Sequence, residues 1–304
     1  GHRTIANESR STTMSFLDRI QACNRCDLSG FIPFVADQQT IGWVRPHFAE
    51  HLAKADQVFM VTDESVSFSD ALETPAARSA AIAAIAPDWV GSGLVAKLRK
   101  EIYPARKTWS GTDHFQLDRA LAPLFGVRAY GVHLNGYVEK HDGIHLWIGR
   151  RSADRRVEPD KLDNMVAGGQ PANLGLMENL IKECAEEADV PSPLAATATP
   201  VGTVSYCFET EAGLKPDTLF CYDLVVPEDF EPRNQDGEIA DFRLMPIQEA
   251  LSLIQTGDAF KFNVSLVILD FAIRHGVLSP DTEPDYEAIL GGLHRVSPLP
   301  GTTQ

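Results

Sequence analysis

Three glutamates spaced at i, i+3 and i+4 are the residues of this chain best suited to chemistry. They are Glu183, Glu186 and Glu187. An α-helix turns by roughly 100° per residue, so the three carboxylates would share an arc of about 100° on one side of a helix. We call these three residues the acidic face. Like charges at this spacing repel one another, and a hard divalent cation with oxygen ligands would offset the repulsion. A solvated helix surface without a metal would show the same spacing.

The other side of the same segment is apolar and predicts a helix packed on a core. Met177, Ile181, Cys184 and Ala188 recur at helical spacing. Pro191 ends the helix because it lacks an N–H and clashes with the preceding turn. The pair of glycines at 168–169 predicts a loop before the helix, along a backbone path that side chains would block.

A predicted β-hairpin upstream of this helix ends in two arginines. Its strands are expected at 129–138 and 144–151, and the second contains Arg150 and Arg151. Arginine matches phosphate oxygens with a forked pair of N–H groups. Alternation along a strand points the two side chains to opposite faces, so at most one is expected to reach a given ligand. A solvated strand end is an equal alternative.

The remaining pattern predicts a mixed α and β chain. Before the hairpin it indicates a small α+β unit, and after the motif helix it indicates further strands and helices. The expected helices are 15–26, 46–54, 75–100 (with a turn at Pro87-Asp88 and a break at 91–93), 115–121, 246–255 and 264–274. The expected strands are 31–35, 40–44, 58–61, 203–208, 218–226 and 242–245.

Composition argues against several classes of partner. The chain has 304 residues and a net charge of −15, which disfavours nucleic acid, because binding to a polyanion needs basic surface. No apolar run approaches the roughly 20 residues that span a membrane. Five cysteines, an odd number, favour a reducing compartment and a cytoplasmic location. Cys23 and Cys26 form a CxxC, but a zinc site would need two more ligands, and we prefer two unrelated cysteines.

The motif resembles the signature of Nudix hydrolases. Gly168 matches the first glycine of that signature, Glu183 the Glu of its Arg-Glu step, and Glu186 and Glu187 its Glu-Glu pair. The resemblance implies that the acidic face binds Mg²⁺ or Mn²⁺, with the backbone carbonyl of Gly168 as a further metal ligand. It also implies that Glu183 and Glu187 help to activate water against a diphosphate.

Three positions depart from that signature. Lys182 replaces the usual Arg and keeps the charge without the planar fork. We expect it to orient the acidic face or to pair with Glu178, four residues earlier, and we count it with Arg150 and Arg151 as a ligand-binding candidate. Leu174 stands where the family has an early Glu, and Asp189 where it has a Gly.

The family often takes one more acid from a later loop, and this chain offers two. Glu238 is the expected catalytic residue, and Asp236 is the reserve. A turn acid without a catalytic role is the alternative.

Residues 42–46, 125–136 and 178–184 extend the resemblance to one Nudix type, which is related to the hydrolase half of fungal thiamine pyrophosphokinase fusions. It implies an α+β fold, with a Nudix α/β/α sandwich after a smaller N-terminal α+β domain. The expected division is an arm or tag over 1–13, an N-terminal domain over 14–128 and a Nudix domain over 129–304.

The implied activity is metal-dependent cleavage of thiamine diphosphate-like compounds to the monophosphate, with oxidised or damaged forms preferred. The partner is then a small diphosphate, and a homodimer is compatible with the pattern. Three alternatives stay open: a Nudix pyrophosphatase for ADP-ribose or another nucleoside diphosphate derivative, a non-catalytic diphosphate-binding module, and an isoprenoid diphosphate isomerase.

Overall fold

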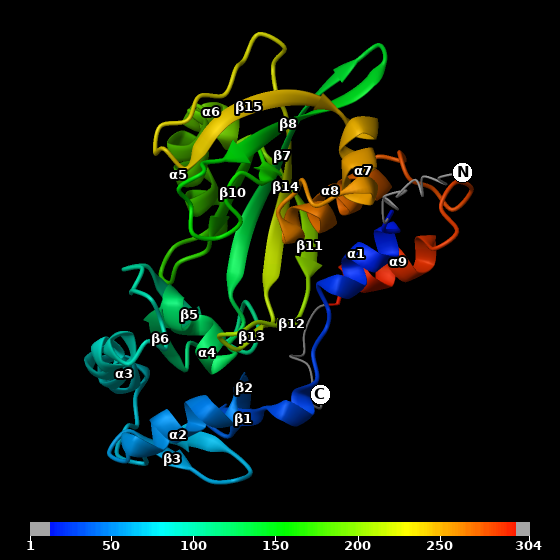
Figure 1. Cartoon of the computed structure of the whole chain (residues 1–304). Coiled ribbons are helices and arrows are strands. Elements are labelled where there is room, and N and C mark those ends of the chain that lie inside the picture. Colours follow the sequence, from blue (N-terminus) through cyan, green and yellow to red (C-terminus); the bar gives the residue numbers. More distant parts are fainter. Residues whose placement is uncertain (1–12, 296–304) are drawn as a thin grey trace, which may run out of the picture.

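A seven-stranded sheet forms the centre of the second half of the chain (Figure 1). The computed structural model describes residues 13–295, so the arm predicted over 1–13 lies outside the described residues apart from its last one. The strands follow the order β11–β14–β7–β8–β15, while β10 pairs with β7 and β9 pairs with β8. The bounds are β7 Tyr130–Lys140, β8 Gly143–Arg151, β9 Leu162–Asn164, β10 Val166–Gly169, β11 Thr199–Ser205, β14 Thr218–Val225 and β15 Ile239–Pro246. The predicted hairpin is confirmed as β7 and β8, which are antiparallel.

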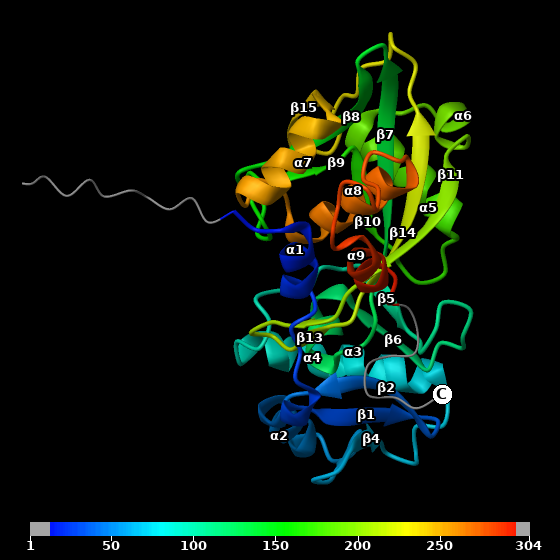
Figure 2. The same ribbon diagram turned by 90° about the vertical axis from the view of Figure 1, so that its right-hand side faces the viewer.

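Helices cover both faces of this sheet (Figures 1 and 2). Their bounds are α5 Leu176–Ala188 and α6 Ser192–Ala195 on one face, and α7 Ile247–Thr256 and α8 Phe262–Arg274 on the other. Side chains along β14 alternate between the two helix layers. Cys221 packs in the α7–α8 core, whereas Tyr222 and Leu224 pack in the α5 core. The α/β/α sandwich and the mixed α+β class are therefore confirmed.

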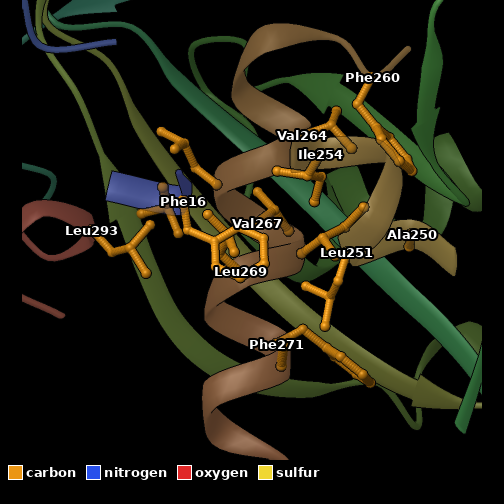
Figure 3. Packing of buried hydrophobic residues seen from close by; sticks show 14 of the residues in the cluster. Phe16, Ala250, Leu251, Ile254, Phe260, Val264, Val267, Leu269, Phe271 and Leu293 are labelled. Atoms are coloured by element: carbon orange, nitrogen blue, oxygen red, sulfur yellow. The ribbon is translucent and has the colours of Figure 1, made fainter. Parts of the chain in front are cut away.

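The larger core lies between the sheet and α8 and also takes in both ends of the described chain (Figure 3). The helices α1 (Phe16–Ala22) and α9 (Tyr286–Leu293) add Phe16 and Leu293 to it. Thus α1, which the predicted division assigns to the first domain, packs with the second half of the chain. The division at 128/129 itself stays a prediction.

The first half of the chain is a smaller α+β unit, in the lower part of Figure 1. Its main sheet has the order β2–β1–β4–β3, and a separate pair of strands is formed by β5 and β6. Phe34 is fully buried, and its ring contacts four other phenylalanine rings, with centroids 5.2–6.2 Å away. The bounds are η1 Leu28–Gly30, β1 Ile32–Ala36, β2 Gln39–Val44, α2 Pro46–Lys54, β3 Phe59–Val61, β4 Val66–Phe68, α3 Pro75–Gly91, β5 Ile102–Ala105, β6 Phe115–Asp118, η2 Arg119–Leu121 and α4 Ala122–Phe125.

Three local predictions are wrong. The helix expected over 115–121 is the strand β6 followed by a 3₁₀ turn, because Phe115 and Leu117 alternate into the core while β6 pairs with β5. The turn expected at Pro87 is absent, and α3 continues to Gly91, which brings Trp89 against the ring of Phe48. The glycine pair at 168–169 ends strand β10 instead of forming a loop.

The CxxC cysteines point to different neighbours. Cys23 is buried in the larger core, whereas the sulfur of Cys26 lies 3.7 Å from that of Cys207. Cys207 precedes the short hairpin of β12 (Phe208–Glu209) and β13 (Leu214–Lys215). Within residues 13–295, no helix is both long enough and apolar enough to cross a membrane.

Candidate active site

The acidic face lies on α5, and its three carboxylates differ in burial. Leu180, Cys184 and Ala188 are fully buried on the core side of the helix. Glu187 is also buried, with 3% of its surface exposed, whereas the side chains of Glu183 and Glu186 are 14% and 47% exposed. The three glutamates therefore form a graded edge between the core and solvent, not one uniformly exposed stripe.

Glu187 is a buried acid whose negative charge is little compensated by nearby groups. Its Oε2 accepts a hydrogen bond from the backbone N–H of Ala167 at 3.0 Å. Burial, and then the charge of Glu183, raise the pKa of Glu187 well above its ordinary value. Burial also raises the pKa of Glu183, against the opposing charge of Lys182. A divalent cation would supply the missing positive charge, so these donors fit a hard metal ion.

The loop after β14 brings the two later acids to this helix. The N–H groups of Arg233 and Gln235 donate to the carbonyls of Ala188 and Glu186, each at 3.1 Å, and the Asn234 side chain donates to the carbonyl of Glu187 at 3.1 Å. These bonds satisfy carbonyls that the end of an α-helix leaves unpaired.

One group of possible metal ligands results from this arrangement. Ligand atoms of Glu187, Asp236 and Glu238 lie within 4.8 Å of one another. Asp236 also accepts hydrogen bonds from Asn234 and from the N–H of Glu238, at 2.9 and 3.0 Å. The expected acid and its reserve thus both meet the acidic face at Glu187.

Two glycines allow close approaches at the end of β10. A Cβ on Gly168 would lie 2.7 Å from Cδ of Glu183. A Cβ on Gly169 would lie 1.7 Å from the hydroxyl of Tyr103, which belongs to the first half of the chain. At both positions a larger residue would have to displace the side chain that fills the space beside the backbone.

The segment between β10 and α5 is ordered by two buried amides. Asn179 donates to the carbonyl of Gly169 at 3.0 Å and to the side chain of Gln170 at 2.9 Å. Gln170 in turn donates to the carbonyl of Leu174 at 2.6 Å. Leu174 thus contributes its backbone where the family has a Glu. Asp189 caps the helix with φ at 53°, a left-handed conformation that suits the family's Gly.

Lys182 lies across the acidic face. Its Nζ is 3.4 Å from Glu183 and 3.5 Å from Glu186. Within the described part of the chain it makes no ion pair with Glu178. The first of its two expected roles, orienting the acidic face, agrees with this geometry.

The two hairpin arginines are engaged elsewhere. Arg150 is paired with Asp160 and Asp241 at 2.9 and 2.7 Å and does not line the cavity described below. Arg151 does line it, but its guanidinium is buried against Asp163 and the carbonyls of 157 and 158. Their N–H groups already bind carboxylates and carbonyls of the chain, and the expectation that one of them reaches a ligand stays a prediction.

The acidic face opens on a cavity of about 1010 Å³ between the two halves of the chain. Sequence reasoning missed most of its other walls. The first half contributes Glu101, Tyr103 and Arg119, and the second half contributes aromatic and basic side chains from the β12–β13 hairpin and the start of α8. No local motif marks these residues, since they meet only through long-range packing.

Comparisons with known proteins identify relatives over most of the chain. A family model described as a domain of unknown function, DUF4743, matches residues 15–129. Nudix hydrolase 20, chloroplastic, from Arabidopsis thaliana is 39% identical over 288 residues, which cover 91% of this chain and 77% of that protein. Nudix hydrolase 24, chloroplastic, from the same plant is 38% identical over 92% of this chain and 77% of its own length.

Among solved structures, the NUDIX domain of Shewanella oneidensis NrtR in complex with ADP ribose is similar over 50% of this chain and 90% of that chain. Its TM-score is 0.40 and its sequence identity 14%. The expected cytoplasmic location is wrong by these comparisons, because both plant relatives are named as chloroplastic proteins. The identity to those relatives extends over nearly the whole chain, and the chain therefore belongs to the Nudix hydrolases, enzymes that cleave phosphoanhydride bonds.

Proposed function

We propose that this chain is a Mg²⁺- or Mn²⁺-dependent hydrolase that cleaves thiamine diphosphate-like compounds, preferentially oxidised forms, to the monophosphate. The observation that carries the proposal is the acidic face, which opens on a cavity that is also lined by aromatic and basic side chains. The resemblance of residues 42–46, 125–136 and 178–184 to the thiamine pyrophosphokinase-related Nudix type supports the substrate class.

The donor set fits a hard divalent cation. Glu183, Glu186 and Glu187 would hold it, with Asp236 and Glu238 close to Glu187. When bound, the metal neutralises phosphate charge and makes water a better nucleophile. Within residues 13–295, the buried carboxylate of Glu187 has no basic partner of its own, which favours a bound cation over an internal ion pair.

Glu183 is the residue that we assign as general base. Its side chain is 14% exposed and lines the cavity, so its carboxylate can reach a water beside a bound diphosphate. Lys182, 3.4 Å from Glu183 Oε1, restrains the carboxylate. Water loses a proton to Glu183 and forms a bond to phosphorus, while the bridging phosphoanhydride bond breaks to release inorganic phosphate and the monophosphate. Glu238 is the alternative base, although Arg155 pairs with it at 3.3 Å.

An aromatic wall suits the organic part of such a substrate. Tyr206, Phe208 and Phe262 line the cavity, and their ring centroids lie 5.1–5.8 Å apart. Aromatic faces and edges stabilise a heteroaromatic ring through stacking and edge contacts. Thiamine has two such rings.

Phosphate release from thiamine diphosphate, its oxidised analogues and ADP-ribose, with and without Mg²⁺, tests the proposal. We expect metal-dependent release that favours the oxidised thiamine compounds and that is lost in Glu187→Gln. Glu249→Gln is a matched control, because Glu249 pairs with Arg243 at 2.6 Å outside the cavity.

Each other outcome has a defined meaning. Cleavage of ADP-ribose alone would support metal-dependent diphosphate hydrolysis and contradict the proposed thiamine diphosphate substrate. Ligand-induced stabilisation without phosphate release would favour the binding module. Conversion of an isoprenoid diphosphate without phosphate release would favour the isomerase.

A further inference from the structure

Among residues 13–295, several contacts join the first half of the chain to the segment beside the acidic face. The N–H of Ala172 donates to the carbonyl of Ile102 at 2.8 Å. The hydroxyl of Tyr103 lies over Gly169, and Gln116 donates to the side chain of Asn173 at 3.3 Å. The β5–β6 pair is therefore docked on the segment between β10 and α5, next to the acidic face.

This docking places Arg119 beside the acidic face. The Nη1 atom of Arg119 is 3.3 Å from the position of a Cβ on Gly169, and the neighbouring Gly168 contacts Glu183. Nη1 is held by Glu101 at 3.0 Å, and the guanidinium lies over the ring of Tyr103, 5.5 Å from its centroid.

The rest of the Arg119 guanidinium is available to a ligand. Its side chain is 35% exposed and lines the cavity. Within the part of the chain that the structure describes, Nε and Nη2 have no hydrogen-bond partner, whereas each side-chain nitrogen of Arg150 and Arg151 has at least one. Arg119 therefore has more free donors than either hairpin arginine.

Lys261 contributes a second free cation to the same cavity. It precedes α8, and its backbone N–H donates to the carbonyl of Leu162 at 2.9 Å. Among residues 13–295, its Nζ has no ion pair or hydrogen bond, and the carboxylate of Asp163 is bonded to Arg151 instead. Burial lowers the pKa of Lys261 to about 8, the charge of Asp163 opposes this, and the charges of Arg151, Arg119 and Lys215 add to it.

A half-buried ammonium without a partner is costly unless an anion binds beside it. We propose that Arg119 and Lys261 together bind a phosphate group in this cavity, so that the N-terminal domain completes the active site. The site takes one phosphate of a diphosphate while the acidic face, with its cation, acts on the other. The identification of that anion with a substrate phosphate rests on the proposed function, but the anion site itself does not.

Calorimetric titration of the full-length, metal-free protein with inorganic pyrophosphate, in the presence of a chelator, tests the anion site. A hydrogen bond to a charged group contributes about 1.5–3 kcal/mol, so Arg119→Gln and Lys261→Met should each weaken binding by about 10-fold or more. Arg119→Lys and Lys261→Arg keep the charge and should recover part of the affinity. Arg243→Gln, which removes an exposed guanidinium outside the cavity, is the matched control and should bind as the wild type does.

Thermal unfolding confirms that each variant is folded before its affinity is read. Glu187→Gln should bind pyrophosphate as well as the wild type or more tightly, since it removes a negative charge from the cavity. Wild-type affinity in both Arg119→Gln and Lys261→Met, or no binding by the metal-free wild type, would overturn the anion site.

The two proposals fail separately. Pyrophosphate binding that depends on Arg119 and Lys261, without any hydrolysis of thiamine diphosphates, would overturn the proposed substrate alone. Metal-dependent hydrolysis with an unchanged KM in both variants would overturn the anion site alone.

Discussion

Replacing Glu187 by Gln should stabilise the metal-free protein while nearly abolishing its turnover. The carboxylate is buried, and its one hydrogen bond to a described residue comes from the N–H of Ala167 at 3.0 Å. The amide oxygen of Gln can accept the same bond in the same space. The substitution therefore removes a charge that burial and Glu183 both disfavour, and it leaves the packing intact.

The size of the effect follows from that burial. A buried polar group that lacks partners costs about 1–3 kcal/mol, and a charged one costs more. We therefore expect Glu187→Gln to add about 1–3 kcal/mol to the free energy of unfolding at pH 8 without metal, or about 2–4 °C in Tm per kcal/mol. Because the pKa of Glu187 is higher in the folded than in the unfolded chain, wild-type stability rises as the pH falls through the folded pKa toward the ordinary one. The variant should lose the share of this rise that comes from Glu187.

Metal should remove most or all of the variant's advantage in stability. At a free cation concentration about 100 times Kd, the wild type gains about 2.7 kcal/mol, and the variant should gain far less. Turnover should fall by at least about 100-fold, because losing even an outer-shell contact to a metal site costs about 10- to 100-fold.

Urea unfolding at pH 6 and pH 8, with chelator and with Mg²⁺, measures both effects, and phosphate release measures turnover. Glu249→Gln, partly exposed on α7, is the control for the loss of a carboxylate. A Glu187→Gln variant that is less stable than the wild type without metal, or that Mg²⁺ stabilises as strongly, would refute the reasoning.

Three further results are expected. Gly168→Ala places a methyl group 2.7 Å from Cδ of Glu183, and displacing that carboxylate should lower kcat by about 10- to 100-fold in steady-state assays. Gly169→Ala places a methyl group against the hydroxyl of Tyr103 and should cost about 1–3 kcal/mol of unfolding free energy. In urea unfolding, adding Tyr103→Phe should recover part of that cost, and losses that simply add would contradict the contact. Affinity for phosphate, followed by calorimetry from pH 7.5 to 9.5, should fall as the pH rises through about 8, since Lys261 loses its proton there. An affinity that does not change with pH would exclude the Lys261 ammonium from the anion site.

Local pattern predicted the elements that hold the acidic face. Helical spacing located α5 and its core side, and alternation located β7 and β8. The same reasoning placed Glu183, Glu186 and Glu187 on one arc, but it did not predict their different burial. The surroundings of Glu187 come from Ala167 of β10 and from the loop 233–238, which folds over the end of α5 from 45 residues further along the chain.

Local sequence pattern could not predict which groups pair with the basic side chains. Alternation correctly separated Arg150 from Arg151, yet the carboxylates that engage them come from residues 160, 163 and 241. Arg119 and Tyr103 lie in segments without any motif. Arg119 also lies in the stretch 115–121, which was expected to be a helix. Only the pairing of β5 with β6 and their docking on residues 169–173 bring both to the cavity.

The contact between Tyr103 and Gly169 has an evolutionary consequence. A side chain at position 169 and a hydroxyl at position 103 compete for the same volume, so the two positions cannot drift independently. Among relatives, any residue larger than Gly at the position of 169 should coincide with a smaller residue at the position of 103. The N-terminal domain and the hydrolase should accordingly be inherited as a matched pair, and chimaeras that join halves from distant relatives should lose activity unless this pair is exchanged together.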